Sequence, residues 1–364
     1  MVYRVLHIMA AADAGGISTV ILNYYRHMDR EKIHFDIAIT TDVIGQNGHR
    51  LKELGCHIYH LTLKSEGLNK YTKSLKELLR KEQFDAVHVH DNETSYVALR
   101  IAKQMGIKKR IAHAHTSSPT SNLKQEIRRV SGCFLNSYYA TNLIGCGILA
   151  GNRVFGKRNM KKSKSIVLPN AIDTEKFKYN SVIRNEVRKE LDLENKYVIG
   201  MIGRLDNQKN HLFVLNLLDS VYAINKNITL VLVGNGSNEL SIKKIIREKH
   251  MEEYVRVLGR RSDVNRLYQA FDMFLLPSLF EGFPVAAVES ITSGLPTLIA
   301  DTITEELKFS ELVEYIPLDS KKWINSILNC KENLHRENSV NNVREHKLDI
   351  LDTAKILEEV YLDK

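Results

Sequence analysis

The chain has 364 residues, of which 43% are hydrophobic and 26% charged, a balance typical of a soluble globular protein large enough for two domains. No run approaches the ~18 consecutive apolar residues of a transmembrane helix, which argues against a membrane-spanning protein. Four widely spaced cysteines without a C-x-x-C pair argue against a structural zinc site and indicate a reducing, cytoplasmic location; they are Cys56, Cys133, Cys146 and Cys330.

The first predicted element is a buried strand in "YRVLHIMA", residues 3–10. The Ala cluster that follows faintly resembles a secretion signal. However, the basic leader is only Arg4, and His7 and Asp13 interrupt the apolar stretch. We therefore interpret this segment as the first strand of a sheet rather than a leader.

Short β-branched runs then alternate with amphipathic helical stretches such as "YTKSLKELLRKE". This alternation predicts βαβ units and parallel sheets, and each half of the chain has the size of one doubly wound domain. The predicted strands after the first cover residues 35–40, 56–62, 85–90, 110–115, 140–146 and 165–169, and then 196–203, 228–234, 254–259, 272–277 and 296–300.

A domain boundary is predicted near "VLPNAIDTEKF", where Pro169 and Asn170 follow a strand and Asp173 resembles a helix cap. We expect an N-terminal domain over residues 1–168 and a C-terminal domain over 169–346. A last helix, at about 347–364, is expected to join the first domain. Its predicted apolar face consists of Ile350, Leu351, Ala354, Leu357, Val360 and Tyr361.

The net charge of +9 is concentrated in the first half. Between Lys124 and Lys164, nine basic residues are opposed by Glu126 alone, around an uncharged interior. This pattern suits an anionic membrane surface. It would also suit nucleic acid, although we expect no nucleic-acid partner, and a solvated basic face is the plain alternative. The nine are Lys124, Arg128, Arg129, Arg153, Lys157, Arg158, Lys161, Lys162 and Lys164.

Two glycine-containing loops follow predicted strands. Gly15 and Gly16 in "MAAADAGGIST" precede a helix, so the backbone could approach a ligand closely and the helix start could face an anion. "VGNGSNE" at 233–239 has only G-x-G. Neither loop completes the dinucleotide fingerprint, which argues against a dehydrogenase.

Arg204 and Lys209 lie together in "GRLDNQKN", directly after a predicted strand of the second half. A guanidinium and an ammonium in one short loop can clamp a diphosphate. A solvated surface loop is the alternative interpretation.

The stretch "SLFEGFPVAAVES", residues 278–290, places Glu281 in a turn and Glu289 on the helix that follows. Pro284 is expected at the first helical position, with unpaired amides around Phe283 to Ala286. Each carboxylate can accept two hydrogen bonds from a vicinal diol. A nucleotide sugar, with a diphosphate between two diol-bearing rings, would match these features. Alternatively, Glu289 pairs with a lysine and Glu281 is an ordinary loop residue.

These residues resemble the retaining GT-B glycosyltransferases of glycosyltransferase family 4. Glu281 and Glu289 match the family's E-x7-E pattern, and "GGIST", "AHAHTS", "GRLDNQKN" and "LPSLFEGFPVAAVESITSGLPTLIAD" agree in order and spacing. The resemblance covers nearly the whole chain, and the N-terminal half is most similar to members that build bacterial capsular or exopolysaccharide repeat units. It implies an α/β GT-B fold with two Rossmann-like domains facing a central cleft and a C-terminal helix crossing back.

The resemblance also implies roles for single residues. Glu281 would hold hydroxyls of the transferred sugar and Glu289 those of the ribose, while Arg204 and Lys209 would neutralise the leaving diphosphate. His115 fits the histidine beside the donor sugar, although His113, one period-two step earlier, stays open. Further donor contacts are implied for Gly15, Gly16, Leu258, Gly259, Gly282, Phe283, Pro284 and Val285; His88 and His90 are interpreted as structural.

The implied reaction moves a sugar from a nucleotide sugar, expected to be UDP-linked, to a saccharide acceptor with retention. A polyprenyl-diphosphate-linked oligosaccharide is the expected acceptor, and the enzyme is expected on the inner face of the cell membrane. No D-x-D pair stands in a metal-binding context, so neither metal nor cofactor is expected. The alternatives are a GT-B-fold epimerase or phosphorylase and a non-catalytic basic surface protein.

Overall fold

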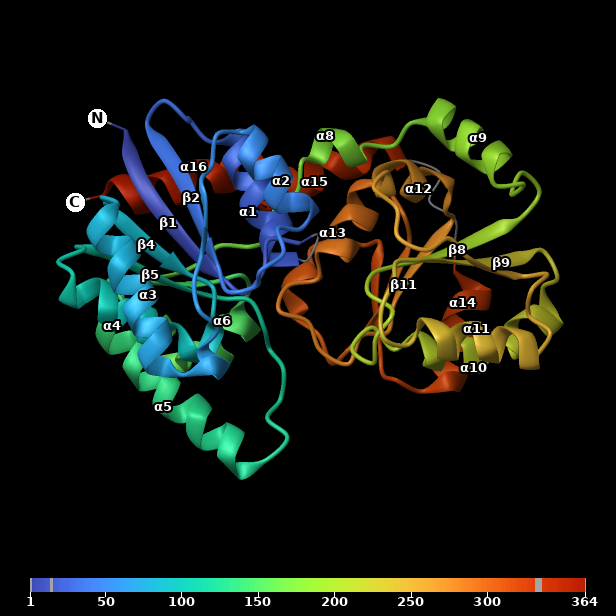
Figure 1. Cartoon of the computed structure of the whole chain (residues 1–364). Coiled ribbons are helices and arrows are strands. Elements are labelled where there is room, and N and C mark those ends of the chain that lie inside the picture. Colours follow the sequence, from blue (N-terminus) through green and yellow to red (C-terminus); the bar gives the residue numbers. More distant parts are fainter. Residues whose placement is uncertain (1, 14–15, 331–335, 364) are drawn as a thin grey trace. The chain divides into compact units, whose positions relative to one another are not determined.

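The computed structural model describes residues 2–13, 16–330 and 336–363. The chain forms two compact units, each built on its own sheet (Figure 1). Unit 1 comprises Met1–Ala171 and Ile350–Lys364, and unit 2 comprises Ile172–Asp349. These boundaries lie three residues beyond the predicted ones at both crossings.

Unit 1 contains a seven-stranded sheet in the order β3-β2-β1-β4-β5-β6-β7, with every neighbouring pair parallel. The strands are β1 (Tyr3–Met9), β2 (Ile33–Ile39), β3 (Ile58–His60), β4 (Ala86–Val89), β5 (Lys109–Ala114), β6 (Asn142–Gly145) and β7 (Ser165–Val167). The helices are α1 (Gly16–His27), α2 (Gln46–Glu53), α3 (Leu68–Lys81), α4 (Ser95–Gln104), α5 (Leu123–Tyr139), α6 (Ile148–Phe155), α7 (Lys157–Met160) and α16 (Ile350–Leu362), with short 3-10 turns η1 (Lys64–Glu66) and η2 (Asn92–Thr94).

Helices cover both faces of the first sheet, because its central strands are apolar on both sides. α1, α2 and α16 pack with the odd-numbered side chains of β1 and β2 in one buried core. α4 contacts β4 and β5 on the other side and is itself contacted by α3 and α5. The last helix of the chain is therefore part of the core of unit 1.

Unit 2 contains a six-stranded parallel sheet in the order β10-β9-β8-β11-β12-β13. The strands are β8 (Tyr197–Ile202), β9 (Ile228–Val233), β10 (Val255–Val257), β11 (Met273–Leu276), β12 (Thr297–Ala300) and β13 (Val313–Ile316). The helices are α8 (Thr174–Phe177), α9 (Ser181–Glu190), α10 (His211–Ile224), α11 (Glu239–Glu248), α12 (Val264–Ala270), α13 (Val285–Thr292), α14 (Ser320–Asn329) and α15 (Ser339–Glu345), with η3 (Glu305–Leu307) and η4 (Arg336–Asn338).

Two details differ from the sequence-based predictions. The edge strand β13 was not predicted, because "VEYI" is short and its side chains are mostly half-exposed. On α16, Leu351 is 53% exposed, whereas Thr353 is fully buried. The buried face therefore runs through Ile350, Thr353, Ala354, Leu357 and Tyr361.

Both sheets have the Rossmann strand order, in which the first strand of a unit lies beside the fourth. The strand order reverses at this point, and the loops at the carboxyl ends diverge to leave a crevice for ligands. The switch point lies between β1 and β4 in unit 1 and between β8 and β11 in unit 2. Most predicted site residues of unit 2 follow these two strands, whereas Leu258 and Gly259 follow β10.

Candidate functional site

Lys209 and Glu281 form an ion pair where the loops after β8 and β11 meet. Lys209 Nζ lies 2.7 Å from Glu281 Oε1, and the two side chains are 15% and 7% exposed. Gln208 Nε2 donates to the other carboxylate oxygen of Glu281 at 3.3 Å. The loops are also joined by the amide of Leu279, which donates to the carbonyl of Gln208 at 2.9 Å. The fold thus unites two predicted residues that stand 72 positions apart.

Gly203 allows Lys209 to reach this position. A Cβ at Gly203 would lie 3.0 Å from Cε of Lys209 and 3.3 Å from its Cδ. The aliphatic stem of the lysine therefore lies directly against the glycine backbone. A larger residue at position 203 would push the ammonium away from Glu281.

Arg204 has a different environment from Lys209, although sequence analysis predicts that both clamp a diphosphate. The Arg204 side chain is 67% exposed, and its Nη2 lies 3.2 Å from Asp206. The same nitrogen donates to Gln208 Oε1 at 3.0 Å. An anionic ligand would therefore share Lys209 with Glu281 and would compete with Asp206 for Arg204.

The helix after the E-G-F-P turn is α13, which begins at Val285 with Pro284 as its N-cap residue. The expectation of unpaired amides around the turn needs one correction. The amide of Val285 donates to the carbonyl of Phe283 at 3.0 Å, because the chain turns tightly at Pro284. In the described part of the chain the amides of Phe283 and Ala286 have no acceptor, so two donors remain for an anion. Gly282 precedes them and is buried.

Glu289 lies on α13 and contacts Tyr268 of α12. The Tyr268 hydroxyl is 2.9 Å from Glu289 Oε2 and 3.0 Å from the carbonyl oxygen of Ala286. Burial raises the pKa of Glu289 to about 7, against the opposing effects of the Tyr268 hydrogen bond and the Lys209 charge. Since a hydroxyl carries one proton, a protonated Glu289 satisfies both contacts by donating to Tyr268, which donates to Ala286. Its partner is a tyrosine rather than the lysine of the alternative interpretation.

Leu258 and Gly259 follow β10 at the same edge of the sheet. The carbonyl of Gly259 accepts a hydrogen bond from the amide of Gly234 at 2.8 Å, which ties the loop after β10 to the loop after β9. Gly259 has a φ of 66°, a conformation that favours glycine. Both Leu258 and Gly259 are partly exposed. They lie two strands from β8, the strand that precedes Arg204 and Lys209.

The remaining predicted residues belong to unit 1. Gly16 begins α1, and a Cβ there would meet no atom of the described residues within 4 Å, so packing against those residues does not require a glycine. Gly15 lies outside the described residues. His113 is 1% exposed, whereas His115, just beyond β5, is partly exposed. Of the two histidines, His115 is therefore the one that a ligand could reach.

Three groups of described side chains bring potential metal ligands within 4.8 Å of one another. Two of these groups are made of histidines inside unit 1. In the third, Asp36 Oδ1 contacts both histidines at 3.1–3.2 Å, while Arg4 binds the other carboxylate oxygen. The groups are His7, His88 and His90; His90, His113 and His115; and His34, Asp36 and His57.

Comparison with known proteins places this site in a family. Models of Glycosyltransferase Family 4 and of Glycosyl transferases group 1 match residues 14–176 and 183–306. The chain is 31% identical over 288 residues to EpsF of Bacillus subtilis (strain 168), a protein named as a glycosyltransferase; the match covers 78% of this chain and 75% of EpsF. The chain belongs to glycosyltransferase family 4.

This family-4 glycosyltransferase is also similar to a second curated protein and to a solved structure. It is 26% identical over 296 residues to the Escherichia coli protein named UDP-Gal:alpha-D-GlcNAc-diphosphoundecaprenol alpha-1,3-galactosyltransferase, with 78% of this chain and 75% of that protein covered. The solved structure of Anabaena HepE in complex with UDP-glucose matches with a TM-score of 0.80 and 18% identity over 98% of both chains. That likeness confirms the predicted GT-B class of two Rossmann-like domains.

Two residues of this family-4 site escaped sequence analysis. Gln208 lies inside the quoted "GRLDNQKN" motif but was given no role, although it bridges Arg204, Phe280 and Glu281. Tyr268 occupies a buried helix position in "NRLYQAF", where an aromatic residue normally indicates only core packing. Nothing in the sequence links Tyr268 to Glu289, because the contact depends on how α12 packs against α13.

Proposed function

We propose that this chain transfers a hexosyl group from a UDP-sugar to a saccharide carried on a polyprenyl diphosphate, with retention and without a metal ion. The observation that carries the proposal is the Lys209–Glu281 ion pair at the switch point of unit 2. It lies beside the start of α13, the helix that also holds Glu289. Together these groups offer a cation and helix amides to a diphosphate, and two carboxylates to two diols.

The chemistry follows from these groups. An ammonium has three donors, so Lys209 can keep Glu281 and still bind a phosphate oxygen as negative charge develops on the leaving diphosphate. Arg204 adds a second cation from the surface. In the proposed front-face reaction the bond from the sugar C1 to the phosphate oxygen breaks, and the acceptor oxygen bonds to C1 on the same face. The departing phosphate oxygen takes the acceptor's proton, so this step needs no separate base.

The identity of donor and acceptor rests on the relatives. The E. coli relative carries UDP-Gal and a diphosphoundecaprenol-linked sugar in its name, and the HepE structure contains UDP-glucose. In this proposal the polyprenyl diphosphate is the carrier on which the sugars of a surface polysaccharide unit are assembled. Which sugar is moved would depend on the side chains that surround Glu281.

A panel of nucleotide sugars, each with and without a lipid-diphosphate disaccharide, tests this function. Acceptor-dependent release of UDP, unchanged by EDTA, is expected, and NMR of the product should show the donor's anomeric configuration retained. Turnover that depends on added Mg²⁺ would contradict metal independence. Inversion at C1 would contradict the front-face mechanism alone.

The alternatives give different outcomes in the same assay. An epimerase would consume a nucleotide sugar without an acceptor and release free UDP or an isomeric sugar. A phosphorylase would require inorganic phosphate. A non-catalytic basic surface protein would leave every donor intact and would show no stabilisation by UDP.

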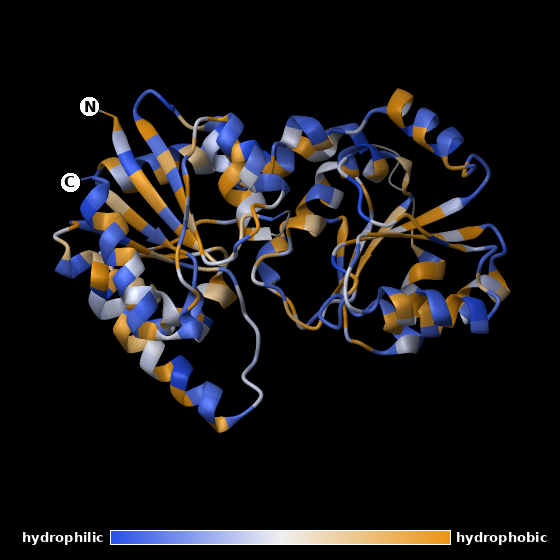
Figure 2. Ribbon diagram, in the orientation of Figure 1, coloured by the Kyte–Doolittle hydropathy of each residue, from blue (hydrophilic) through white to orange (hydrophobic). Residues whose placement is uncertain are grey.

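A second proposal concerns α5 of unit 1, which we infer contacts an anionic membrane surface. Five of its large apolar side chains are 55% to 76% exposed. At 3.6 residues per turn they lie within an arc of about 80° and extend over about 22 Å. Orange and blue segments alternate along this helix (Figure 2). The five, which we call the α5 stripe, are Leu123, Ile127, Val130, Phe134 and Tyr138.

The basic residues around the α5 stripe divide into two sets. Arg129 and Arg153 pair with Glu126, and Lys164 donates to a backbone carbonyl at 3.0 Å, so these three stabilise unit 1 itself. The other six are exposed. Basic groups beside an exposed apolar stripe favour an anionic bilayer over a merely solvated face. The six are Lys124, Arg128, Lys157, Arg158, Lys161 and Lys162. Within the described ranges no helix is long and apolar enough to cross a membrane.

A further inference from the structure

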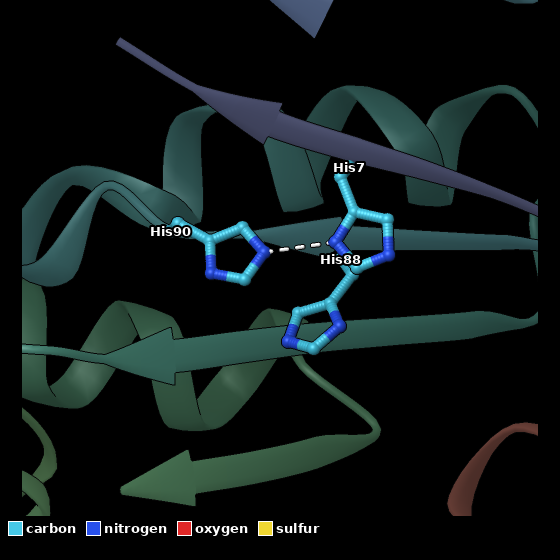
Figure 3. Close-up of side chains that lie close together, drawn as sticks. All are labelled: His7, His88 and His90. Atoms are coloured by element: carbon cyan, nitrogen blue, oxygen red, sulfur yellow. Dashed lines mark hydrogen bonds between the residues drawn. The ribbon is translucent and has the colours of Figure 1, made fainter. Parts of the chain in front are cut away.

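Five histidines lie on one face of three neighbouring strands in unit 1. His7 on β1 stands opposite His88 on β4 in the sheet register. His90 and His113 each lie one period-two step from another histidine, so all five rings gather on that face. Tyr361 of α16 contacts two of them, His7 and His88. Figure 3 shows the three rings contributed by His7, His88 and His90. Two of the five, His88 and His90, are given only a structural role by sequence analysis.

Hydrogen bonds join these rings and Tyr361 of α16 into one chain. Its first half runs from His113 Nδ1 to His88 Nε2 at 3.2 Å, and from His88 Nδ1 to the Tyr361 hydroxyl at 2.7 Å. Its second half runs from that hydroxyl to His7 Nε2 at 3.4 Å and from His7 Nδ1 to His90 Nε2 at 3.0 Å. It ends with His90 Nδ1 and His115 Nε2, 2.8 Å apart. We call this set the histidine chain.

The rings of the histidine chain are neutral. His7, His88, His90 and His113 are at most 4% exposed, and burial lowers the pKa of His7 and of His115 to about 3. A neutral imidazole carries one N–H and one lone pair. Each ring can therefore donate once and accept once. The Tyr361 hydroxyl could accept from both of its neighbours, but its own buried proton would then have no acceptor among the described residues. All the protons therefore point the same way along the chain.

The inner end decides which way they point. His113 Nε2 is buried and has no hydrogen-bond partner among the residues that the structure describes. If the protons pointed inward, this nitrogen would carry a buried N–H without an acceptor, which proteins rarely tolerate. If they point outward, only a lone pair is left unpaired there. The outward direction makes His90 Nδ1 donate to His115 Nε2, which leaves the proton of His115 on Nδ1.

We propose that the histidine chain holds His115 as its Nδ1–H tautomer, with His90 as the positioning residue that fixes it. The outer, partly exposed end then presents a hydrogen-bond donor to a ligand oxygen. This deepens the proposed function, since it rests on His115 contacting the donor sugar. The lone pair of His115 is occupied by His90, so His115 is not the base that deprotonates the acceptor. The histidine chain also supplies no proton, because no described acid bonds to His113 Nε2 at its inner end.

A metal ion is the competing explanation for such a cluster. Zinc would need a free lone pair from each of three rings. In the chain the lone pairs of His7, His88, His90 and His115 each accept a hydrogen bond, and only that of His113 is unpaired. Hydrogen bonding therefore accounts for these contacts without an ion.

The test is long-range ¹H–¹⁵N NMR of the full chain labelled in histidine, with His115 assigned from the His115→Gln spectrum. We expect the Nδ1–H pattern for His115 in the wild type. An Nε2–H pattern overturns the inference and leaves the proposed transferase function untouched. A change in the His7 and His90 signals after dialysis against EDTA also overturns it, because an ion would then join the rings.

Two substitutions at His90 separate positioning from folding. His90→Leu removes the donor to His115, so the tautomer should shift towards Nε2–H, and kcat should fall about 10- to 100-fold with the UDP dissociation constant unchanged. His90→Asn keeps an amide N–H near the position of Nδ1 and should restore both the tautomer and most of kcat. Equal effects of the two substitutions on the tautomer overturn the inference. Full transfer activity in His115→Gln would instead refute the role of His115 in the proposed function.

Discussion

Lys209 and Glu281 neutralise each other's charge in a largely buried ion pair, unlike two charged side chains on exposed loops. Both side chains are largely buried in their mutual contact. A buried ion pair contributes little net stability, but removing one partner leaves an uncompensated charge that costs about 3–5 kcal/mol. The residues proposed to bind the donor therefore also stabilise the loop that positions them.

We expect Lys209→Met to lower the free energy of unfolding by about 3 kcal/mol and turnover by roughly 100- to 1,000-fold. The double variant Lys209→Met/Glu281→Gln should recover most of the stability and none of the turnover. Arg204→Ala is the matched control, because its side chain is 67% exposed and should change stability by less than about 0.5 kcal/mol. Urea denaturation with steady-state assays measures both quantities. Equal stability in Lys209→Met and wild type would show that the ion pair is not buried in solution.

Glu289 should make UDP binding depend on pH. The pKa of Glu289 is raised to about 7 in the folded protein, so the folded state favours the protonated carboxyl group. The contribution of Glu289 to the free energy of unfolding is therefore greatest below the ordinary carboxyl pKa and falls as the pH rises towards 7. Ribose hydroxyls donate best to the ionised form. UDP affinity should therefore rise with pH up to about 7, and binding at pH 6 should release a proton. Calorimetry in buffers of different ionisation enthalpy counts that proton.

Substitution of the two glutamates separates their roles. Glu289→Gln should abolish the proton release and raise the UDP dissociation constant roughly 10- to 150-fold, the loss of one charge-assisted hydrogen bond worth about 1.5–3 kcal/mol. Glu281→Gln should depress transfer and leave UDP affinity nearly unchanged, because UDP lacks the transferred sugar. Equal weakening in both variants would mean that the assignment of the two carboxylates is wrong.

At the scale of an element, α5 differs from a core helix because its large apolar side chains face away from the protein. Only Gly132 and Asn136 of its residues are buried, and Gly132 is required because a Cβ there would lie 2.4 Å from the carbonyl oxygen of Glu93. The helix contacts α4, α6 and η2, yet few of its side chains are buried by these contacts. Its apolar side chains are left exposed, which is costly in water unless another surface covers them.

Binding of α5 to vesicles is expected to need both its apolar and its basic residues. Phe134→Ser should weaken binding to phosphatidylglycerol vesicles about tenfold or more, since burying a phenylalanine contributes about 1.5–3 kcal/mol. Replacing Lys157, Arg158, Lys161 and Lys162 with Gln should weaken it further and reduce its salt dependence. Val182→Ser on α9, at a residue that is 64% exposed, is the matched control. Salt-insensitive binding, or concentration-dependent dimers instead of vesicle binding, would contradict the membrane proposal.

At the scale of the whole molecule, the alternation of strands and helices was sufficient to predict two doubly wound units, and the resemblance added the GT-B class. The contacts that define the site were less accessible. Lys209 and Glu281 were predicted separately, yet their pairing depends on β8 and β11 being neighbours, which follows from sheet order and not from local pattern. The histidine chain was visible only as repeated H-x-H spacing, because its link through Tyr361 comes from the far end of the chain.

The return of α16 to unit 1 predicts that the two units respond separately to substitution. Leu357 is 1% exposed in the core that α16 shares with α1, whereas Leu351 on the same helix is 53% exposed. Leu357→Ala should cost about 2–5 kcal/mol, and Leu351→Ala much less. In calorimetry, Leu357→Ala should lower the transition of unit 1 alone, and Leu218→Ala, at a fully buried position of unit 2, should lower the other.

UDP at ~100 times its dissociation constant adds about 2.7 kcal/mol to the unit that binds it. That gain should raise the transition lowered by Leu218→Ala and leave the one lowered by Leu357→Ala unchanged, because the groups proposed to hold the nucleotide belong to unit 2. If UDP raised the transition temperature of unit 1 alone, the assignment of the nucleotide site to unit 2 would be wrong.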